Sequence, residues 1–583
     1  MSEAPGGSSI AELLWWRASR SPARRAYLFL DDRGGEQEER SYADLARRAH
    51  AIARALLSVA RPGDRAVLLF DPGMSFLDAF FGCLYAGVIA VPMMPPRPRR
   101  GGEASLAVLR DCAPRVVLTT RTLAPRLEQT LRAAGLDPHP AVVAVDEIVP
   151  AADMRADDPP PCRAAPGDIA FLQYTSGSTS LPKGVIVTHG NLRADARMIA
   201  GAMGQDQKSN FVGWTPLYHD QGLIGNVLQP LHLGVPAVLM APHAFLQRPH
   251  LWLEAIDRYR AHTSGGPDFA FSLIADRIDA KKHSALDLSC WKVAFNGAEP
   301  IRPDVLERFA RSLAPFGFHP SAIYPCYGLA EATLFSTGAR PGGGAVLRCF
   351  ERSAEGRLRA APDGIRLASS GRAPPELALT IVDAKTRARL GEGMIGEIWL
   401  AGPSVARGYW RQPDATLETF GAFALDGSGP YLRTGDLGAV VDGELYVCGR
   451  LKDVIILRGR NLYPQDIEAT ARNAHPALSQ GSAVAAAITV AGAEKLLLAV
   501  EINRTARHGS EAAAVAAAIR RAVRDEHDVL IDRLVLLLPG GIPKTTSGKV
   551  QRRALARAFE AGELASWRDD PPTSVEPPQL MSS

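Results

Sequence analysis

The stretch IAFLQYTSGSTSLPKG, residues 169–184, is an apolar run followed by a loop of glycine, serine and threonine that ends at Lys183. The apolar run is typical of a buried strand. The loop offers backbone N–H groups and hydroxyls to phosphate oxygens, and the lysine adds a positive charge. It is not a Walker A loop, because that motif ends in Gly-Lys-Ser/Thr and the order here is Lys183-Gly184. The stretch predicts nucleotide chemistry of another kind, with a plain Ser/Gly-rich linker as the alternative.

Similar β-branched, apolar runs lie on both sides of this loop. They begin at Ala66, Val88, Arg115, Ala141 and Val235, and segments with helical periodicity, such as the one from Leu251, separate several of them. Apolar strands that alternate with helices predict parallel sheets covered on both faces. The expected fold class is α/β, with a large N-terminal domain of layered, mostly parallel sheets, a small β-rich subdomain and a small, mobile α+β C-terminal domain.

Changes in composition along the chain predict the domain boundaries. Residues 1–447 form the expected N-terminal domain, and the glycine-rich residues 371–447 form its β-rich subdomain. Residues 454–566 form the expected α+β domain, in which Ser510 caps a helix. The Pro- and Ser-rich residues 567–583 are expected to be a disordered tail.

Composition excludes several classes of protein. The chain has 583 residues, of which 46% are hydrophobic and 22% charged, so it can bury a sizeable core. A net charge of +4 gives no strong attraction to nucleic acid. The longest apolar run, Ala79–Met94, is short for a membrane span and predicts a buried helix that leads into a strand. The N-terminus does not resemble a signal peptide, and seven scattered cysteines without a CxxC motif indicate free thiols in a reducing cytoplasm.

Four later segments carry further polar residues. YPCYGLAEAT places Tyr327 and Glu331 four residues apart, on one face if the segment is helical, and YLRTGDLG places Asp436 at the end of a predicted strand. GRLKDVIILRGRNLYPQDIE spans residues 449–468, and PKTTSGKVQR contains Lys549. A GxGxxG match at residues 391–396 runs directly into a strand-like segment, so it predicts a turn and not a dinucleotide site.

Together, and in this order, the segments resemble the adenylate-forming superfamily of acyl-CoA synthetases, luciferases and peptide-synthetase adenylation domains. The resemblance covers roughly residues 10–560 and is greatest to the fatty acyl-AMP ligases. PLYHDQGL at residues 216–223 and GRNLYPQDIE at residues 459–468 match that branch. About 31 residues separate Gly338 from Ser370, and within them residues 346–365 resemble the insertion of that branch, which is thought to disfavour CoA as the acceptor.

The resemblance implies that a carboxylate attacks the α-phosphorus of ATP, with ATP and Mg²⁺ as cofactors. Two anions must meet, so positive charge and a metal matter more than a base. The implied catalytic residues are Lys549, Glu331, His219 and Lys183, with Glu331 as the Mg²⁺ ligand and His219 near the acyl carboxylate. The implied nucleotide-binding residues are Thr175, Ser176, Gly177, Ser178 and Thr179 for the phosphates, Asn296, Gly297, Ala298, Tyr327 and Gly328 for adenine, and Asp436 and Arg450 for ribose. Lys452 lies in the implied hinge, residues 448–453.

The implied reaction makes acyl-AMP and pyrophosphate from a medium- or long-chain fatty acid. The implied acceptor is the phosphopantetheine thiol of a holo acyl carrier protein, or of a carrier domain of a polyketide or nonribosomal peptide synthase, in polyketide, lipopeptide or lipid biosynthesis. The alternatives are a long-chain acyl-CoA synthetase, an amino-acid adenylation enzyme, in which Asp220 could hold the substrate ammonium, and a non-catalytic adenylate-binding scaffold. No nucleic acid and no membrane span are expected.

Overall fold

The computed structural model divides the chain into two units. The first contains Met1–Thr434 and Ala439–Val447, and the second contains Gly435–Gly438 and Cys448–Ser583. The residues that the structure describes are 9–95, 102–175, 182–353, 355–457, 460–478, 481–490, 493–502, 510–544, 550–564 and 568–570. The division after Val447 coincides with the end of the predicted N-terminal domain, but four residues of the predicted domain, Gly435–Gly438, group with the second unit.

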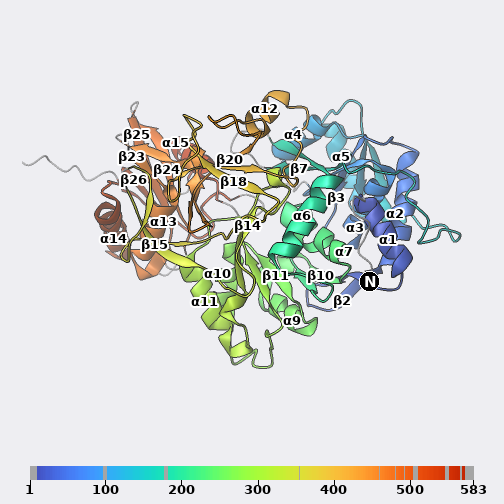
Figure 1. The fold of residues 1–583 in the computed structure, drawn as a ribbon, viewed down its shortest axis with the longest axis horizontal. Helices are drawn as coiled ribbons and strands as arrows, with labels where there is room; N and C mark the ends of the chain where they lie inside the picture. The colour runs from blue at the N-terminus through green and yellow to red at the C-terminus, as the bar shows by residue number, and fades with distance from the viewer. Residues whose placement is uncertain are drawn as a thin grey trace, which may run out of the picture. The chain divides into compact units, whose positions relative to one another are not determined.

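Two large sheets form the framework of the first unit (Figure 1). The six-stranded sheet has the order β6 (Ala141–Ala144), β5 (Val116–Thr119), β3 (Arg65–Leu69), β4 (Ile89–Met93), β7 (Ile169–Thr175) and β8 (Lys183–Thr188). Its strands are parallel up to β7, and β8 runs antiparallel to β7. Five of these strands coincide with the predicted apolar runs, and the α/β fold class is confirmed.

The eight-stranded sheet has parallel central strands and antiparallel edges. Its order is β14 (Thr337–Gly338), β13 (Ile323–Tyr327), β12 (Val293–Asn296), β11 (Thr263–Gly266), β9 (Phe211–Gly213), β10 (Ala237–Met240), β1 (Arg25–Leu30) and β2 (Glu36–Ser41). The edge strands β14 and β2 pair antiparallel with their neighbours. The carboxyl ends of β12 and β13 therefore lie side by side at one edge of the sheet.

Helices cover both faces of these sheets, as continuous apolar strands require. Side chains of α1 (Ile10–Arg20), α2 (Tyr42–Leu57), α3 (Met74–Ala86) and α6 (His189–Ala202) share one apolar cluster with residues of both sheets. Helices α4 (Gly102–Cys112) and α5 (Ala124–Ala133) cover the other face of the six-stranded sheet, and α9 (His250–Arg258), α10 (Asp268–Arg277) and α11 (Pro303–Leu313) cover that of the eight-stranded sheet. The predicted helix and strand of Ala79–Met94 are confirmed as α3 and β4.

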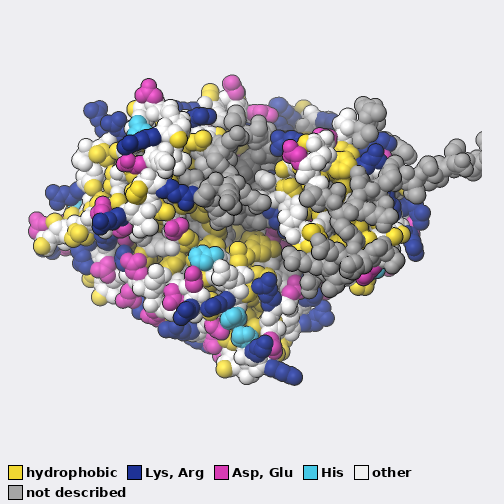
Figure 2. Space-filling view, turned by 180° about the vertical axis from the view of Figure 1, so that it is seen from behind, with side chains coloured by type: hydrophobic (Ala, Val, Ile, Leu, Met, Phe, Trp, Pro, Cys, Tyr) yellow, Lys and Arg dark blue, Asp and Glu magenta, His cyan; other side chains and the backbone are white. Residues whose placement is uncertain are grey.

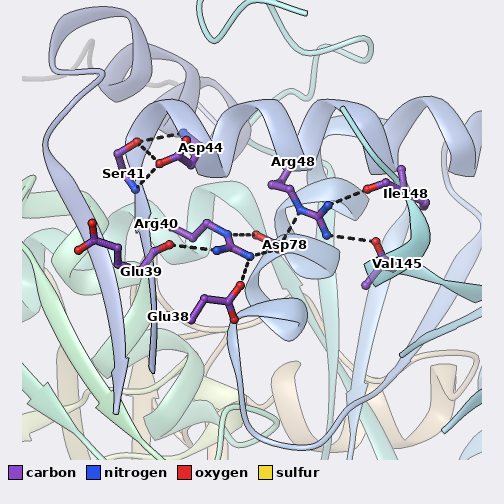
Figure 3. Close-up of polar contacts among 9 residues, drawn as sticks. All are labelled: Glu38, Glu39, Arg40, Ser41, Asp44, Arg48, Asp78, Val145 and Ile148. Carbon is purple, nitrogen blue, oxygen red and sulfur yellow. Dashed lines mark hydrogen bonds and ion pairs between the residues drawn. The ribbon is translucent and has the colours of Figure 1, made fainter. Parts of the chain in front are cut away.

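A polar network of residues from β2, α2 and α3 holds a fully buried carboxylate, that of Asp78 on α3 (Figure 3). Arg40 donates from Nη2 to Oδ2 of Asp78 at 3.0 Å, and Arg48 donates from Nε to the same oxygen at 3.1 Å. Arg48 also donates to the carbonyl oxygens of Val145 and Ile148 at 3.1 and 2.6 Å. The network ties α2 and α3 to the chain after β6.

Residues 346–365, the candidate insertion, contribute two strands to a small antiparallel sheet. The sheet has the order β16 (Leu358–Ala360), β15 (Leu347–Arg352) and β17 (Ile365–Ala368). Phe350 and Leu358 are buried, and the Phe350 ring packs edge-on against Tyr446 with centroids 4.8 Å apart. The segment is thus anchored on the first unit.

The predicted β-rich subdomain contains a four-stranded sheet and one helix. The strands are β18 (Ala378–Val382), β19 (Gly396–Ala401), β20 (Leu432–Val441) and β21 (Glu444–Arg450), and the helix is α12 (Pro413–Phe420). The GxGxxG match ends in β19, and Gly393 lies in a turn with φ +74°. The prediction of a turn at this match is confirmed.

The second unit contains a small α+β core. Strands β24 (Ala483–Val490), β25 (Ala493–Glu501), β26 (Arg533–Leu537) and β27 (Arg568–Asp570) form a sheet beside a hairpin of β22 (Ile455–Leu457) and β23 (Arg460–Leu462). The helices are α13 (Pro464–Asn473), α14 (Ser510–His527) and α15 (Arg552–Glu560). Because β27 pairs with β26, the prediction of disorder from residue 567 onward is wrong for residues 568–570; residues 571–583 lie outside the described part.

The surface carries acidic and basic side chains together. Lys and Arg side chains are interspersed with Asp and Glu over the described part of the face drawn in Figure 2. Across the described ranges, every helix is too short or too polar to cross a lipid bilayer. The seven cysteines are all free thiols, as predicted.

Candidate active site

The predicted phosphate loop joins two antiparallel strands. β7 ends at Thr175 and β8 begins at Lys183, and these two residues pair across the hairpin. Of the predicted loop residues, Ser176, Gly177, Ser178 and Thr179 lie outside the described part of the chain. A strand follows the loop, whereas a helix follows a Walker A loop. The secondary structure therefore agrees with the interpretation, made from the order Lys183-Gly184, that this is not a Walker A loop.

A segment that sequence reasoning did not single out, Pro403–Trp410, lies alongside β8; we call it the strap. Arg407 donates its N–H to the Ile186 carbonyl at 3.1 Å, and Ile186 donates to the Gly408 carbonyl at 2.9 Å. Trp410 donates to the Gly184 carbonyl at 2.7 Å. These bonds extend the hairpin by one irregular strand and fix the strap beside Lys183.

Tyr409 of the strap covers the side chain of Lys183. The Lys183 ammonium lies 4.6 Å from the centre of the Tyr409 ring, which is within the range of a cation–π interaction. In the described ranges, no carboxylate lies within ion-pair distance of this ammonium. Lys183 is thus held by an aromatic face and keeps its charge for another anion.

Glu331 also contacts Tyr409. The Tyr409 hydroxyl donates to Oε1 of Glu331 at 2.9 Å, and the Glu331 carbonyl accepts the N–H of Ala406 at 2.8 Å. Burial raises the pKa of Tyr409, and the neighbouring Glu331 charge raises it further, so the phenol stays protonated and acts as the donor. Tyr409 was not predicted as a site residue, because a tyrosine after a glycine in a β-rich stretch has no distinctive pattern.

The segment from Tyr327 to Glu331 is not an α-helix, so the condition under which the two residues would share one helical face is not met. Tyr327 ends β13, and Glu331 lies in a 3₁₀ turn, Ala330–Ala332. A Cβ on Gly328 would lie 1.7 Å from the Leu334 carbonyl oxygen, so the chain folds back too closely for a helix. Thr333 has φ +71° and its hydroxyl donates to the Ser404 carbonyl at 2.5 Å, which ties this reversal to the strap.

The residues proposed for adenine gather at one edge of the eight-stranded sheet. Parallel pairing places Asn296, the last residue of β12, next to Pro325 of β13, so the chain after each strand emerges at the same edge. A Cβ on Gly297 would lie 2.8 Å from the Cys326 carbonyl oxygen, and Ala298 has φ +69°. The side-chain oxygen of Asn296 is buried and has no hydrogen-bond partner among the residues that the structure describes. This edge therefore combines a tight turn with an unsatisfied polar atom.

His219 lies in the turn before an eight-residue π-helix, Gln221–Leu228. Its Nδ1 is 2.6 Å from Oδ1 of Asp220, and both side chains are mostly covered. Asp195 on α6 carries a carboxyl that is fully buried, and burial raises its pKa, as does the charge of Asp220. π-Helical turns are frequent at functional sites, and neither this one nor Asp195 was predicted from the sequence.

The remaining predicted residues belong to the second unit. Asp436 lies within β20, Leu432–Val441, so its prediction as a strand-end residue is wrong. Its Oδ1 accepts a hydrogen bond from Nε of Arg450 at 3.0 Å; Asp436 is mostly buried, whereas the Arg450 side chain is 58% exposed. Lys452 lies in a 3₁₀ turn, Leu451–Asp453, and Lys549 lies outside the described part.

The donor set around Glu331 suits magnesium. Within the described part of the chain, no three His, Cys, Asp or Glu side chains come together as a ready-made metal site. Mg²⁺ is commonly held by one or two carboxylates together with phosphate oxygens and water. One carboxylate beside a phosphate hairpin fits this pattern, whereas it would not fit a structural zinc site.

Family models and curated relatives match this chain over most of its length. The family model described as AMP-binding enzyme matches residues 14–410, and the model described as Disco-interacting protein 2-like, AMP domain, matches residues 452–568. A medium-chain-fatty-acid–[acyl-carrier-protein] ligase of Moorena producens is 39% identical, with 97% of each chain covered. A long-chain-fatty-acid–AMP ligase of Mycolicibacterium smegmatis is 35% identical, with 97% of this chain and 96% of the relative covered.

A solved structure shares the fold over nearly the whole chain. It is the fatty acyl-adenylate ligase of Legionella pneumophila in complex with acyl adenylate and pyrophosphate, with 36% identity, a TM-score of 0.73, and coverage of 97% of this chain and 98% of that one. The family models together match residues 14–410 and 452–568, and the relatives match this chain over nearly its whole length. The chain therefore belongs to the family of AMP-binding enzymes, as a fatty acyl-AMP ligase of the adenylate-forming superfamily.

Proposed function

We propose that the protein activates a medium- or long-chain fatty acid with ATP and passes the acyl group to the thiol of a holo acyl carrier protein. In the first step, a carboxylate oxygen of the fatty acid forms a bond to the α-phosphorus, and the bond to the bridging oxygen of pyrophosphate breaks. In the second step, the carrier thiolate attacks the acyl carbonyl, and AMP leaves with the electron pair. The observation that carries the proposal is the meeting of Lys183 and Glu331 around Tyr409, next to the β7–β8 hairpin.

The first unit supplies the proposed nucleotide and acyl contacts. Lys183 and the hairpin loop would hold the β- and γ-phosphates, where a fixed positive charge offsets the charge of the departing pyrophosphate. Glu331 would hold Mg²⁺ against the same phosphates, and the ion would supply further positive charge when bound. His219 would lie near the acyl carboxylate. The adenine base would lie at the sheet edge, among Asn296, Gly297, Ala298, Tyr327 and Gly328, where the unpartnered Asn296 oxygen supports a polar ligand.

The second unit supplies the proposed ribose and α-phosphate contacts. Asp436, oriented by Arg450, would accept hydrogen bonds from the ribose hydroxyls. Lys549 would bridge the attacking carboxylate and the α-phosphate. Residues 448–453, including Lys452, would form the hinge about which the C-terminal domain rotates between the two half-reactions. A few residues at the end of a secondary-structure element can absorb the change in backbone dihedral angles that this rotation requires.

The carrier thiol is the proposed acceptor, in preference to free CoA. The names of relatives from two organisms support it, because both are acyl-carrier-protein ligases. Residues 346–365, the candidate branch insertion, are anchored on the first unit by the buried side chains of Phe350 and Leu358. A carrier domain of a polyketide or nonribosomal peptide synthase would serve in the same way. Seven free thiols support a reducing compartment, for which we propose the cytoplasm.

The test is a two-stage assay. The protein is incubated with ATP, Mg²⁺ and fatty acids of increasing length, and acyl-AMP is measured; CoA or a holo carrier protein is then added. We expect acyl-AMP with medium or long acids and transfer to the carrier. AMP formation only with amino acids would contradict the substrate class, and efficient acyl-CoA formation would favour a CoA synthetase.

A variant separates the chemistry from nucleotide binding. Lys549→Ala removes a charge directed at the α-phosphate, so we expect adenylation to fall about 10²–10³-fold. ATP affinity should change less, because Lys183 and the hairpin remain. Near wild-type adenylation by this variant would remove Lys549 from the proposed mechanism.

A further inference from the structure

Tyr409 is the residue through which the two proposed phosphate-binding elements contact each other. Its hydroxyl donates to Glu331 at 2.9 Å, and its ring lies 4.6 Å from the Lys183 ammonium. Tyr409 is buried, with a relative exposure of 7%. One residue thus contacts both the cation and the carboxylate that the proposed function assigns to Mg·ATP.

The backbone around Tyr409 is held from several sides. Its N–H donates to Oγ1 of Thr416 at 2.9 Å, and Val185 of β8 forms a bridge to it. Gly408 has φ +141°, and a Cβ there would lie 2.4 Å from Cγ2 of Thr416, so the approach requires glycine. The Tyr409 ring also packs edge-on against Phe420, with centroids 5.1 Å apart. The position of the phenol is therefore fixed before any nucleotide binds.

The hydroxyl and the ring do different things. A carboxylate can only accept hydrogen bonds, so the phenol must donate, and this donation fixes the orientation of the Glu331 carboxylate. The ring gives the Lys183 ammonium a favourable contact that is not a carboxylate. If Lys183 instead formed an ion pair with Glu331, each would cancel the charge that the other offers to Mg·ATP. The aromatic face keeps the two charges available.

We propose that Tyr409 is a positioning residue that sets the Glu331 carboxylate through its hydroxyl and the Lys183 ammonium through its ring. The inference rests on the proposed function, because it assigns Glu331 to Mg²⁺ and Lys183 to phosphate. A purely structural Tyr409 would fill space in the core and would need the ring alone.

The test compares Tyr409→Phe, which keeps the ring, with Tyr409→Leu, which removes both groups. Calorimetry measures binding of ATP with and without Mg²⁺, and steady-state assays give kcat and the KM values for ATP and fatty acid. Tyr85→Phe is the matched control, because Tyr85 is also buried and its hydroxyl has no hydrogen-bond partner in the described part of the chain.

For Tyr409→Phe we expect ATP affinity in the presence of Mg²⁺ to fall about 10-fold, because removing the group that orients a metal ligand typically has an effect of 10–100-fold. Affinity without Mg²⁺, the KM for fatty acid and the melting temperature should stay near wild type. Tyr409→Leu should also weaken Mg²⁺-free binding. In a Glu331→Gln background, Tyr409→Phe should have little further effect on Mg²⁺-dependent binding, since the two residues act as one unit.

Wild-type affinity for Mg·ATP in Tyr409→Phe would overturn the inference, as would an equal loss with and without Mg²⁺. Failure of the proposed function is a separate outcome, because in that case the wild-type protein itself would make no acyl-AMP. An effect of Tyr85→Phe as large as that of Tyr409→Phe would also overturn the assignment, since it would reflect loss of core packing.

Discussion

Two networks of the first unit combine basic and acidic side chains in opposite ways. In the first, Asp78 is fully buried and accepts hydrogen bonds from two arginines, Arg40 and Arg48 (Figure 3). In the second, Lys183 and Glu331 both contact Tyr409, and the lysine faces the aromatic ring. The first network neutralises its own charges, because Arg40 also forms an ion pair with Glu38 at 2.6 Å, whereas the second keeps a cation and a carboxylate apart.

The difference follows from what each network must bind. A buried carboxylate without partners is unstable, so the Asp78 network is complete within the protein. A site for an anionic nucleotide and a cation needs charge that is not already neutralised. Substitutions in the two networks should therefore separate stability from activity.

The largest expected effect is on stability, from Asp78→Asn. The change removes the carboxylate that Arg48 and Arg40 share, although Arg40 keeps its ion pair with the partly exposed Glu38. Breaking a buried pair typically costs about 3–5 kcal/mol. Urea unfolding followed by circular dichroism measures this loss. Adenylation per folded molecule should be nearly unchanged. Unfolding free energy within 1 kcal/mol of wild type would show that the Asp78 network is not the structural one.

The second effect is on activity, from Glu331→Gln. The amide keeps the size and can still accept the Tyr409 hydrogen bond, but the negative charge is lost. We expect acyl-AMP formation to fall about 10²–10³-fold, equivalent to about 3–4 kcal/mol. The free energy of unfolding, measured in the same urea assay, should stay within about 1 kcal/mol of wild type. A stable variant with full activity would contradict the proposed role of Glu331.

A third effect tests a buried histidine that belongs to the structural side of the comparison. His189 is buried and its Nδ1 accepts the N–H of Ile10 at 3.2 Å. Burial lowers the pKa of His189 from 6.5 to about 4. Above pH 6.5 the ring is neutral in both states; as the pH falls below 6.5, the unfolded chain binds a proton that the folded chain does not, so stability decreases until about pH 4.

The expected loss from this group at pH 5 is at most about 2 kcal/mol relative to pH 7.5. Unfolding at both pH values, with His189→Asn as the variant that cannot titrate, isolates the contribution. Burial also lowers the pKa of His232, to about 3, and that residue remains in both proteins. An identical pH dependence in wild type and variant would exclude His189 as its source.

The smallest effect is expected at an exposed ion pair, Arg25 with Glu39. Their side chains are 42% and 56% exposed, with the charged atoms 2.7 Å apart. Exposed pairs contribute about 0.2–1 kcal/mol, so Glu39→Gln should change unfolding within that range and leave acyl-AMP formation intact. A loss of unfolding free energy above this range would show that an exposed ion pair stabilises the protein as much as a buried one. Burial would then not explain the large effect expected at Asp78.

The sequence predicted the elements of the site better than their geometry. The strand and loop that lead to Lys183 were recognised because apolar β-branched runs and phosphate loops have local patterns. Tyr327 and Glu331 were identified as residues of interest, but whether the segment between them is helical was left open, because the close approach of Gly328 to Leu334 depends on packing and not on local preference. Asp436 was placed at a strand end, whereas β20 continues to Val441 because neighbouring strands pair with it.

The sequence by itself determined the α/β class and the family of the chain, because apolar runs and ordered motifs are local features of a sequence. The boundary near residue 447 and the residues proposed to contact the nucleotide stay predictions. Only the tertiary structure decided that the strap lies against β8 and that Tyr409 contacts both Lys183 and Glu331. Tyr409 lies more than 200 residues after Lys183 in the chain. Contacts over such separations are fixed by how sheets and turns pack together, and no local pattern records them.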